Sequence, residues 1–211
     1  MRRVVVTGMG MLAPFGRGVD YNWENIVAGK SAIRRIDEDL ELYDVPVKIA
    51  GKVPMGKEAH RFDPDTVMEP KEQRRVDKFI LFGMAAGIDA MEDSGWKPES
   101  EEEQYRAGVM MGSGIGGLQT IYENSVIINE NKSTHRVSPF FIPSCLINMI
   151  SGNLSIRFGL KGPNHACVTA CSTGTHAIGD AAAMIARGDA DLMLAGGAEA
   201  AVNILGLEIG R

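Results

Sequence analysis

Apolar and polar positions along the chain predict strands that alternate with helices. Four short runs of β-branched, apolar or small residues are typical of strands buried on both faces of a sheet; they lie at 4–7, 107–111, 165–170 and 191–195. Apolar spacing of the helical kind occupies 20–28, 71–93, 118–129, 146–158 and 175–187. This alternation predicts an α/β fold, with a mostly parallel sheet, right-handed crossovers and helices on both faces.

Two segments carry more specific predictions. Residues 175–187 are small and apolar on nearly every side, so we expect a helix buried between layers. Residues 99–103 form an acidic run without apolar spacing, which predicts a solvated loop.

Composition limits the class of protein. The chain has 211 residues, 45% of them hydrophobic and 23% charged, which is ordinary for one large globular domain. A net charge of −5 argues against a nucleic-acid binder. No run approaches the roughly 18 apolar residues of a membrane span, and the N-terminus has no leader-like apolar region. We therefore expect a cytoplasmic protein with neither nucleic-acid nor membrane partners.

The distribution of cysteine and histidine predicts no disulfide framework and no metal. Three cysteines form an odd set, and Cys167 and Cys171 have CxxxC spacing, which differs from the CxxC of redox and zinc motifs. The four histidines are scattered, without the spacing of metal ligands.

Two glycine-rich segments invite comparison with nucleotide-binding motifs. Residues 8–13 match GxGxxA after a predicted strand, but Pro14 and Gly16 interrupt the helix that would cradle a pyrophosphate. Residues 112–117 lack the Gly-Lys-Ser/Thr ending of a phosphate-binding loop. We predict no nucleotide or other cofactor, and we interpret the second segment as a turn whose glycines allow close backbone approach.

Cys171 is the candidate nucleophile. It lies where a predicted strand gives way to residues 172–174 and a helix, so its sulfur would lie near helix N-terminal amides. Their partial positive charge favours the thiolate, which is the nucleophilic form. Position alone also allows the more common role of a small buried hydrophobe, which is our interpretation of Cys145 and Cys167.

Several motifs occur in an order that resembles one family. They are residues 5–10 (VVTGMG), 112–117 (GSGIGG), 138–143 (SPFFIP), 162–163 (GP), 169–174 (TACSTG), 188–191 (GDAD) and 196–199 (GGAE). Together they resemble the N-terminal half of bacterial 3-oxoacyl-(acyl carrier protein) synthase II. The resemblance covers nearly the whole chain.

The resemblance implies a fold, a reaction and site residues. The fold would be thiolase-like, with residues 1–211 as the N-terminal beta-ketoacyl synthase domain and the C-terminal half absent. Cys171 would accept an acyl group from acyl carrier protein, and malonyl carrier protein would then lose carbon dioxide and attack the thioester. The Cys171 amide would serve an oxyanion hole, and Ile115 would line the acyl pocket. Ordinary core packing is the alternative role for Ile115.

A group of basic residues suits an acidic partner. Lys71, Arg74, Arg75 and Lys78 have the spacing of one helix face, which is usually only a solvated surface. The resemblance implies that acyl carrier protein docks here, chiefly on Lys71, Arg74 and Arg75, and that the full-length protein is a homodimer. Complementary charge would steer the encounter.

The chain also departs from the family. The resemblance places a catalytic histidine pair, a supporting lysine and a glycine-rich phenylalanine loop in the C-terminal half, so we expect this chain alone not to condense. His165 and His176 are interpreted as structural. Two alternatives remain: a non-catalytic module that binds acyl carrier protein, and a thiolase relative that uses coenzyme A. The cysteine favours acyl transfer over binding alone, and the basic residues favour the carrier over coenzyme A.

Overall fold

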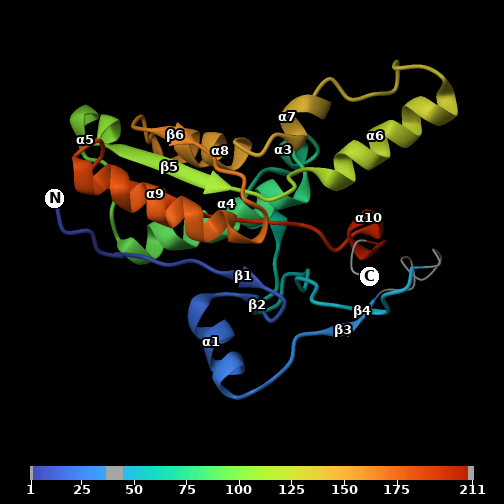
Figure 1. Ribbon diagram of the computed structural model, residues 1–211, viewed down its shortest axis with the longest axis horizontal. Helices are drawn as coiled ribbons and strands as arrows, with labels where there is room; N and C mark the ends of the chain where they lie inside the picture. The colour runs from blue at the N-terminus through green and yellow to red at the C-terminus, as the bar shows by residue number, and fades with distance from the viewer. Residues whose placement is uncertain (1, 37–44, 209–211) are drawn as a thin grey trace.

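A three-stranded parallel sheet forms the centre of the molecule (Figure 1). The computed structural model describes residues 2–36 and 45–208. In the sheet, β5 (Ala107–Gly112) lies between β6 (Asn164–His165) and β7 (Leu192–Gly197), and both pairings are parallel. Every residue of β5 is buried. The predicted parallel sheet is therefore confirmed, with the second predicted strand as its central element.

Helices cover both faces of this sheet, as the sequence predicts. The helix α8 (Met149–Phe158) comes between β5 and β6 in the chain, and α9 (Thr173–Arg187) connects β6 to β7. Because β6 and β7 flank β5 on opposite sides, right-handed crossovers place α8 and α9 on opposite faces. On the α8 side, α4 (Lys78–Ser94) packs against both α8 and the sheet.

The main hydrophobic core lies between α4, α8 and the sheet. Its fully buried members include Phe79, Ile80, Val109, Ile150 and Leu154. Two glycines of α4 make the helix contact close: a Cβ at Gly83 would lie 2.7 Å from Ile150 Cγ2, and one at Gly87 would lie 2.6 Å from Leu154 Cδ1. Side chains of α8 thus fill the spaces that these glycines leave.

The strand predicted at residues 4–7 is wrong. Residues 3–11 belong to no strand or helix, and Val5 and Val6 are 63% and 76% exposed. The β-branched run favours extended backbone, but a strand also needs a neighbour, and the described residues offer it none. The segment lies against α4 instead, where a Cβ at Gly8 would lie 2.3 Å from the Ala90 carbonyl oxygen.

The long helix predicted at 71–93 is broken in two. The short α3 (Pro70–Gln73) ends before Arg74, and α4 begins at Lys78. Asp77 causes the break, because its Oδ1 accepts a hydrogen bond from the Phe79 N–H (3.2 Å) and caps the new helix. Asp77 Oδ2 also accepts from the Thr120 hydroxyl (2.7 Å), which fixes the cap against the following layer. The four basic residues therefore do not share one helix face.

The acidic run at 99–103 is not the loop that was predicted. Residues Glu101–Tyr105 form α5, which begins after Ser100. The Ser100 hydroxyl accepts from the Glu103 N–H (3.2 Å), and Glu103 Oε2 accepts from the Glu99 N–H (2.6 Å). This reciprocal pairing caps the helix, and the carboxylates of the first turn are stabilised by the positive end of its dipole.

The remaining elements surround this centre. They are α1 (Val19–Val27), α6 (Leu118–Asn131), α7 (Phe141–Cys145), α10 (Ile204–Glu208), η1 (Pro64–Thr66), η2 (Ala170–Ser172) and two antiparallel pairs, β1 (Leu12–Ala13) with β2 (Gly16–Arg17) and β3 (Arg34–Arg35) with β4 (Ile49–Ala50). The helices predicted at 20–28, 118–129 and 146–158 are confirmed with small shifts of their ends.

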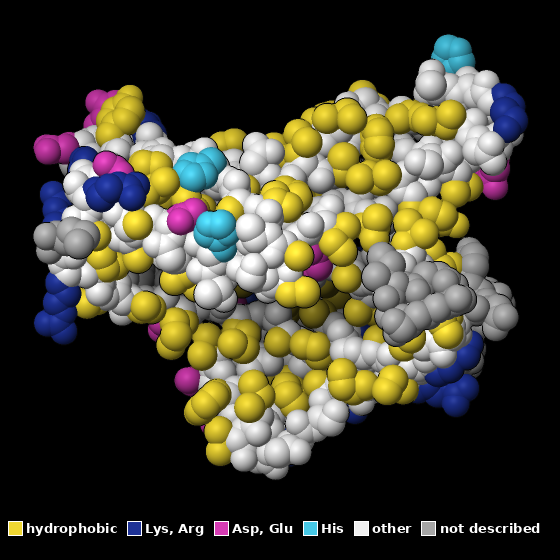
Figure 2. Space-filling model, viewed as in Figure 1, with side chains coloured by type: hydrophobic (Ala, Val, Ile, Leu, Met, Phe, Trp, Pro, Cys, Tyr) yellow, Lys and Arg dark blue, Asp and Glu magenta, His cyan; other side chains and the backbone are white. Residues whose placement is uncertain are grey.

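One face of the molecule is unusually apolar. In Figure 2, hydrophobic side chains gather over the N-terminal segment and α1, below α9. The exposed members include Val5, Val6, Met9, Trp23, Ile26 and Val27. The prediction that α9 is buried on all sides is also wrong, because Ile178 is 54% exposed. Surfaces of this kind are typical of interfaces.

None of the helices in residues 2–36 and 45–208 combines the length and the apolar character needed to cross a membrane.

Candidate active site around Cys171

Cys171 is exposed on a tight turn between the sheet and α9. It is the middle residue of η2, and α9 begins two residues later, at Thr173. The strand predicted at 165–170 is mostly wrong, since β6 ends at His165 and residues 166–169 are not a strand. The predicted position of Cys171, just ahead of a helix N-terminus, is confirmed.

The backbone before Cys171 is strained and held in place by a buried hydroxyl group. Ala170 has φ +52°, a left-handed conformation that costs a non-glycine residue about 1–3 kcal/mol. The Thr173 hydroxyl donates to the Ala170 carbonyl oxygen (2.7 Å) and accepts from the Thr169 N–H (2.9 Å). Because Thr173 is buried, these bonds are shielded from water. The sequence analysis did not identify Thr173 as part of the site.

The glycine turn after β5 packs directly against this backbone. A Cβ at Gly112 would lie 2.3 Å from the Cys167 carbonyl oxygen and 2.4 Å from Thr173 Cγ2. A Cβ at Gly114 would lie 3.0 Å from Ala170 Cα. The prediction that these glycines allow close backbone approach is confirmed, and the segment they approach is the turn that carries Cys171.

Glu199 holds the glycine turn from the other side. Its Oε1 accepts from the Ser113 hydroxyl (2.9 Å), and its Oε2 accepts from the Gly114 and Ile115 N–H groups (both 2.9 Å). Ser113 in turn accepts from the Gly116 N–H (3.0 Å). A single carboxylate thereby fixes the loop that packs against the turn of Cys171. In the sequence, Glu199 stands out only as part of a motif; its place two residues after an apolar strand and a pair of glycines was the available signal.

Ile115 lies at the surface of the glycine turn. Ile115 is 44% exposed, and its backbone N–H is one of the two that donate to Glu199. Ordinary core packing does not account for this position. The role of Ile115 in lining an acyl pocket stays a prediction.

The other two cysteines differ from Cys171 in exposure. Cys145 and Cys167 are both half-buried. Burial raises the pKa of the Cys145 thiol, which favours the protonated form, and its Sγ donates to the Ile142 carbonyl oxygen (3.3 Å). The Cys167 thiol donates to the Thr173 carbonyl oxygen (3.4 Å). Neither is placed as a nucleophile.

The two histidines closest to Cys171 in sequence have other partners. His176 Nδ1 lies 3.2 Å from the Thr169 hydroxyl, and its Nε2 lies 3.3 Å from Asp180 Oδ2. The backbone carbonyl of His165 accepts from the buried Ser151 hydroxyl (2.9 Å). Their structural role remains a prediction. Across the described ranges, no three His, Cys, Asp or Glu side chains gather in a way that could hold a metal ion.

The predicted docking residues are divided between two environments. Arg75 pairs with Glu72 (2.9 Å), and its guanidinium lies 4.4 Å from the centre of the Phe140 ring. Lys71 is exposed in α3. Arg74 is also exposed and, together with Lys78, it borders a hollow of about 530 Å³ whose apolar lining includes Met55, Phe62, Val76 and Leu81. Arg74 and Lys71 are thus presented to solvent, whereas Arg75 is engaged within the chain.

A parallel sheet with helices on both faces, and an exposed cysteine ahead of the crossover helix, define the N-terminal half of a thiolase-like fold. Solved structures agree. The ketosynthase structure described as "AntDE:AntF (apo): type II PKS acyl-carrier protein in complex with its ketosynthase bound to the hexaketide" aligns with a TM-score of 0.80 and 26% identity, over 98% of this chain and 47% of that one. A beta-ketoacyl synthase from Burkholderia phymatum STM815 aligns with a TM-score of 0.73 and 27% identity, over 92% and 46%.

The chain belongs to the beta-ketoacyl synthase family: residues 1–209 match the family described as "Beta-ketoacyl synthase, N-terminal domain". It is 52% identical to 3-oxoacyl-(acyl-carrier-protein) synthase 2 of Rhizobium meliloti (strain 1021), over 96% of this chain and 48% of that protein. It is 50% identical to the synthase 2 of Vibrio cholerae, over 98% and 48%. The chain spans about half the length of the curated relatives it matches, and the family resemblance seen in the sequence is confirmed.

Proposed function

We propose that Cys171 is the nucleophile of a condensing enzyme of fatty-acid elongation. The Cys171 thiolate attacks the thioester of acyl carrier protein, a new carbon–sulfur bond forms, and the carrier leaves as its thiolate. Malonyl carrier protein then loses carbon dioxide, and the resulting carbanion attacks the acyl-cysteine. The products are 3-oxoacyl carrier protein and the regenerated Cys171 thiolate.

The exposed position of Cys171 on a fixed turn ahead of α9 is the observation that carries this proposal. The positive end of α9 favours the thiolate and the negative charge that develops on attack. The next two amides are already used, because Ser172 N–H donates to the Thr169 carbonyl and Thr173 N–H to the Ala170 carbonyl. The Cys171 amide is the donor that we assign to the oxyanion hole.

Ile115 would limit the depth of the acyl pocket. It lies next to Gly114, the residue that approaches the backbone before Cys171, and its branched side chain is partly open to solvent. An acyl chain bound at Cys171 would contact this turn. A smaller side chain there should admit longer acyl groups.

Acyl carrier protein is the partner that the basic residues suit. Lys71 and Arg74 would pair with its acidic surface, and the hollow beside Arg74 would accept an apolar side chain. Arg75 would contribute less, because it already pairs with Glu72 and stacks on Phe140. The similar solved structure of a ketosynthase in complex with its acyl-carrier protein supports this partner class.

Condensation requires groups beyond this domain. We propose that residues 1–211 act as the N-terminal domain of a cytoplasmic homodimeric synthase, whose C-terminal half supplies the groups that decarboxylate malonyl carrier protein. The chain by itself would perform at most the acyl-transfer half of the reaction. Restoring condensation therefore requires the complementary half.

Intact-mass measurement after incubation with long-chain acyl carrier protein tests the half-reaction. We expect an acyl adduct on the chain, its loss in Cys171→Ala and its retention in Cys145→Ala, a control that removes a different thiol. An adduct that survives Cys171→Ala would contradict the assignment of the nucleophile.

A module that binds the carrier without chemistry is the second candidate. The exposed cations around the hollow of Arg74 favour it, since docking needs no nucleophile. Carrier binding without any acyl adduct would favour this function over acyl transfer. A thiolase relative that uses coenzyme A would instead form the adduct from acyl-coenzyme A, and the variant Arg74→Glu would leave that reaction unchanged.

A further inference from the structure

Glu199 reaches the glycine turn from the neighbouring strand of the sheet. The strands β5 and β7 pair in parallel up to Gly112 and Gly197, and the Ala198 N–H donates to the Gly112 carbonyl oxygen (3.0 Å) just beyond. The backbone on either side of the contact is therefore fixed by the sheet, whereas Glu199 itself is exposed. Truncation of its side chain should leave no cavity in the core.

Three donors form a cradle around this carboxylate: the Ser113 hydroxyl and the backbone N–H groups of Gly114 and Ile115. One carboxylate oxygen, Oε1, accepts from Ser113, and the other, Oε2, accepts from both N–H groups, each at 2.9 Å. Successive backbone N–H groups that converge on one point are a common anion site, and hydrogen bonds to a charged acceptor are stronger than neutral ones. Donors on both oxygens are the pattern that suits a carboxylate, which accepts through each of them.

The cradle is also held by contacts that do not involve Glu199. Ser113 is only 1% exposed, and its hydroxyl accepts from the Gly116 N–H (3.0 Å). Gly116 has φ +72°, and a Cβ there would lie 3.0 Å from the Cys145 carbonyl oxygen, so this end of the turn is closely packed. The three donors should therefore stay near their places when the carboxylate is removed, open to another acceptor.

Gly114 brings the carboxylate and the turn of Cys171 together. A Cβ at Gly114 would lie 3.0 Å from Ala170 Cα and also 3.0 Å from Glu199 Oε2. Ala170 is the strained residue directly before Cys171. Because such a conformation persists only while its surroundings enforce it, movement of the glycine turn would change the backbone that carries Cys171.

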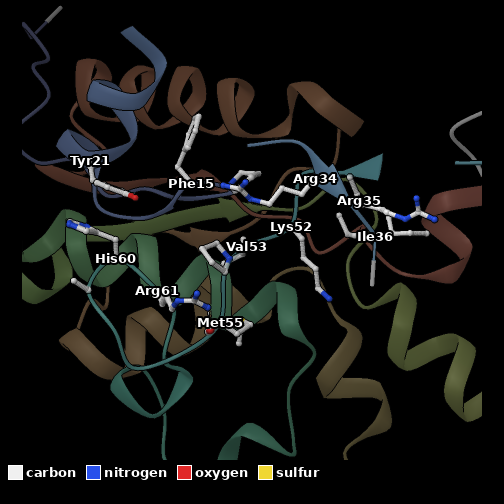
Figure 3. A pocket seen from close by; sticks show the side chains of 15 residues that line it. Phe15, Tyr21, Arg34, Arg35, Ile36, Lys52, Val53, Met55, His60 and Arg61 are labelled. Atoms are coloured by element: carbon white, nitrogen blue, oxygen red, sulfur yellow. Dashed lines mark hydrogen bonds between the residues drawn. The ribbon is translucent and has the colours of Figure 1, made fainter. Parts of the chain in front are cut away.

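We propose that Glu199 is a positioning residue for Cys171, and that the cradle is a carboxylate site which a free carboxylate fills when the Glu199 side chain is truncated. The inference rests on the proposed role of Cys171, but its test needs no acyl transfer. The cradle is separate from the cavity of about 550 Å³ beside α1 and the β3–β4 pair (Figure 3), because the described residues that line that cavity include neither 112–117 nor Glu199.

Rescue of Glu199→Ala by sodium formate tests the site on the 211-residue chain. Iodoacetamide alkylation of Cys171, followed by peptide mass mapping, reports the state of the turn. At about 150 mM ionic strength, which screens exposed charges, Glu199→Ala should slow alkylation about threefold or more. Formate should restore the rate to within about twofold of the parent, with saturation and a midpoint of about 1–100 mM, as expected for so small an anion. The parent should not respond, because its own carboxylate is held at high effective concentration.

Glu199→Gln is the matched control, because it removes the charge while its side chain still fills the cradle, so formate should not rescue it. Addition of Ser113→Ala to Glu199→Ala removes one donor and should weaken formate about threefold or more. Sodium chloride at the same ionic strength should rescue neither variant. Unchanged alkylation in Glu199→Ala, or equal rescue by chloride, or equal rescue of Glu199→Gln, would overturn the proposal.

Glu199→Asp guards against misfolding of the alanine variant. It keeps the carboxylate on a side chain that is one methylene shorter, so it cannot reach all three donors and should also slow alkylation. Alkylation at the parent rate in Glu199→Asp would overturn the proposal as well. A chain that shows formate rescue but takes no acyl group would contradict the proposed function and would support the carboxylate site.

Discussion

The turn around Cys171 and the basic surface at residues 71–78 are held in different ways. At the turn, the Thr173 hydroxyl holds the backbone before Cys171, and the glycine turn that packs against this backbone is held by Glu199. At the basic surface, Lys71 and Arg74 extend into solvent, and the helix beneath them is interrupted. Chemistry on a thioester requires atoms placed to a fraction of an ångström, whereas steering of an acidic partner requires only charge of the right sign.

The two regions also differ in the free energy that their conformations cost. A strained alanine at residue 170 persists only because its neighbours over-determine its conformation. Exposed cations carry no such cost, and each contributes little on its own. Substitutions at the turn should therefore act on folding and chemistry together, while substitutions of the exposed Lys71 and Arg74 should act on association alone.

The largest effect is expected from Gly112→Ala. The added Cβ meets the Cys167 carbonyl oxygen and Thr173, both closer than 2.5 Å, so the end of β5 or the turn must move. We expect a loss of about 2–4 kcal/mol in the free energy of unfolding and much slower acylation of Cys171. Urea unfolding and intact mass measure the two effects.

Gly179→Ala is the control for this change. Gly179 lies inside α9 with open space around its Cβ position. It should be neutral or stabilising by up to about 1 kcal/mol, because alanine favours the helix. If both alanine variants behaved alike, close packing at the turn would not be the cause.

Thr173→Val should have the next largest effect. The change keeps the shape of the side chain but removes the hydroxyl between the Thr169 N–H and the Ala170 carbonyl. The Thr169 N–H loses its partner, whereas the Ala170 carbonyl keeps the bond from the Thr173 N–H. Loss of these two part-buried bonds should cost about 1–3 kcal/mol, and Ala170 should relax from its left-handed conformation. Slower alkylation of Cys171 by iodoacetamide would report the relaxation, with the exposed Thr175→Val as control.

Glu199→Gln should act at the glycine turn with a smaller cost. The amide keeps only one acceptor oxygen, so it cannot accept from the Ser113 hydroxyl and from the Gly114 and Ile115 N–H groups at the same time. We expect a loss of about 1–2 kcal/mol in stability and a change in the acyl chain lengths accepted, measured by intact mass over a series of acyl carriers. Glu123→Gln, on exposed α6, should change neither.

Charge reversal at the basic surface should distinguish the solvent-exposed Arg74 from Arg75, which already has partners within the chain. Arg74→Glu should weaken carrier binding about three- to tenfold at low salt, with the effect shrinking as salt rises, and should leave the stability of the chain unchanged. Arg75→Glu should also lower stability, because it removes the Glu72 pair and the Phe140 contact. Fluorescence anisotropy of labelled carrier measures binding. An equal loss of carrier affinity in Lys97→Glu, which lies outside residues 71–78, would mean that binding does not depend on this surface in particular.

The smallest effect concerns acid stability far from both regions. Hydrogen bonds from Arg106 and Arg2 hold the pKa of Asp191 well below its usual range. A lowered carboxyl pKa contributes stability above the unfolded value of about 4, and this contribution is lost as the pH falls through the folded value. Because the pair is exposed, Asp191→Asn should lower Tm at pH 7 by only about 1–2 °C, and the gap should narrow below pH 4.

Features that depend on residues close together in the sequence could be predicted, whereas features that depend on contacts between distant residues could not. The buried strand β5 and helix α6 carry their own patterns, and the motif around Cys171 predicts a cysteine just ahead of a helix. The left-handed backbone of Ala170 could not be predicted, because that conformation is stabilised by Thr173 and by the glycines of a strand nearly sixty residues earlier. The same holds for Glu199, whose partners lie 84–86 residues away.

The wrong predictions fall where a distant contact overrides the pattern of the sequence, or where a predicted strand has no neighbouring strand to pair with. The apolar spacing of 71–93 continues through the break, and only the contacts of Asp77 with Thr120 and Ser144 show why a new helix starts there. The run at 4–7 has the composition of a buried strand, but composition does not say whether a neighbouring strand is present.

The pairing of β5 with β7 has a consequence for the synthesis of the chain. Arg106 and Asp191, which meet at the start of that pairing, are 85 residues apart. At about 5–20 residues per second, a ribosome needs several seconds to add the missing strand after β5 is complete. During that interval β5 first lacks both of its neighbours and then, once β6 has been made, still lacks β7. An unpaired strand whose residues are all buried in the folded chain favours aggregation and chaperone binding. The order of elements along the chain thus exposes the future core before its closing strand exists.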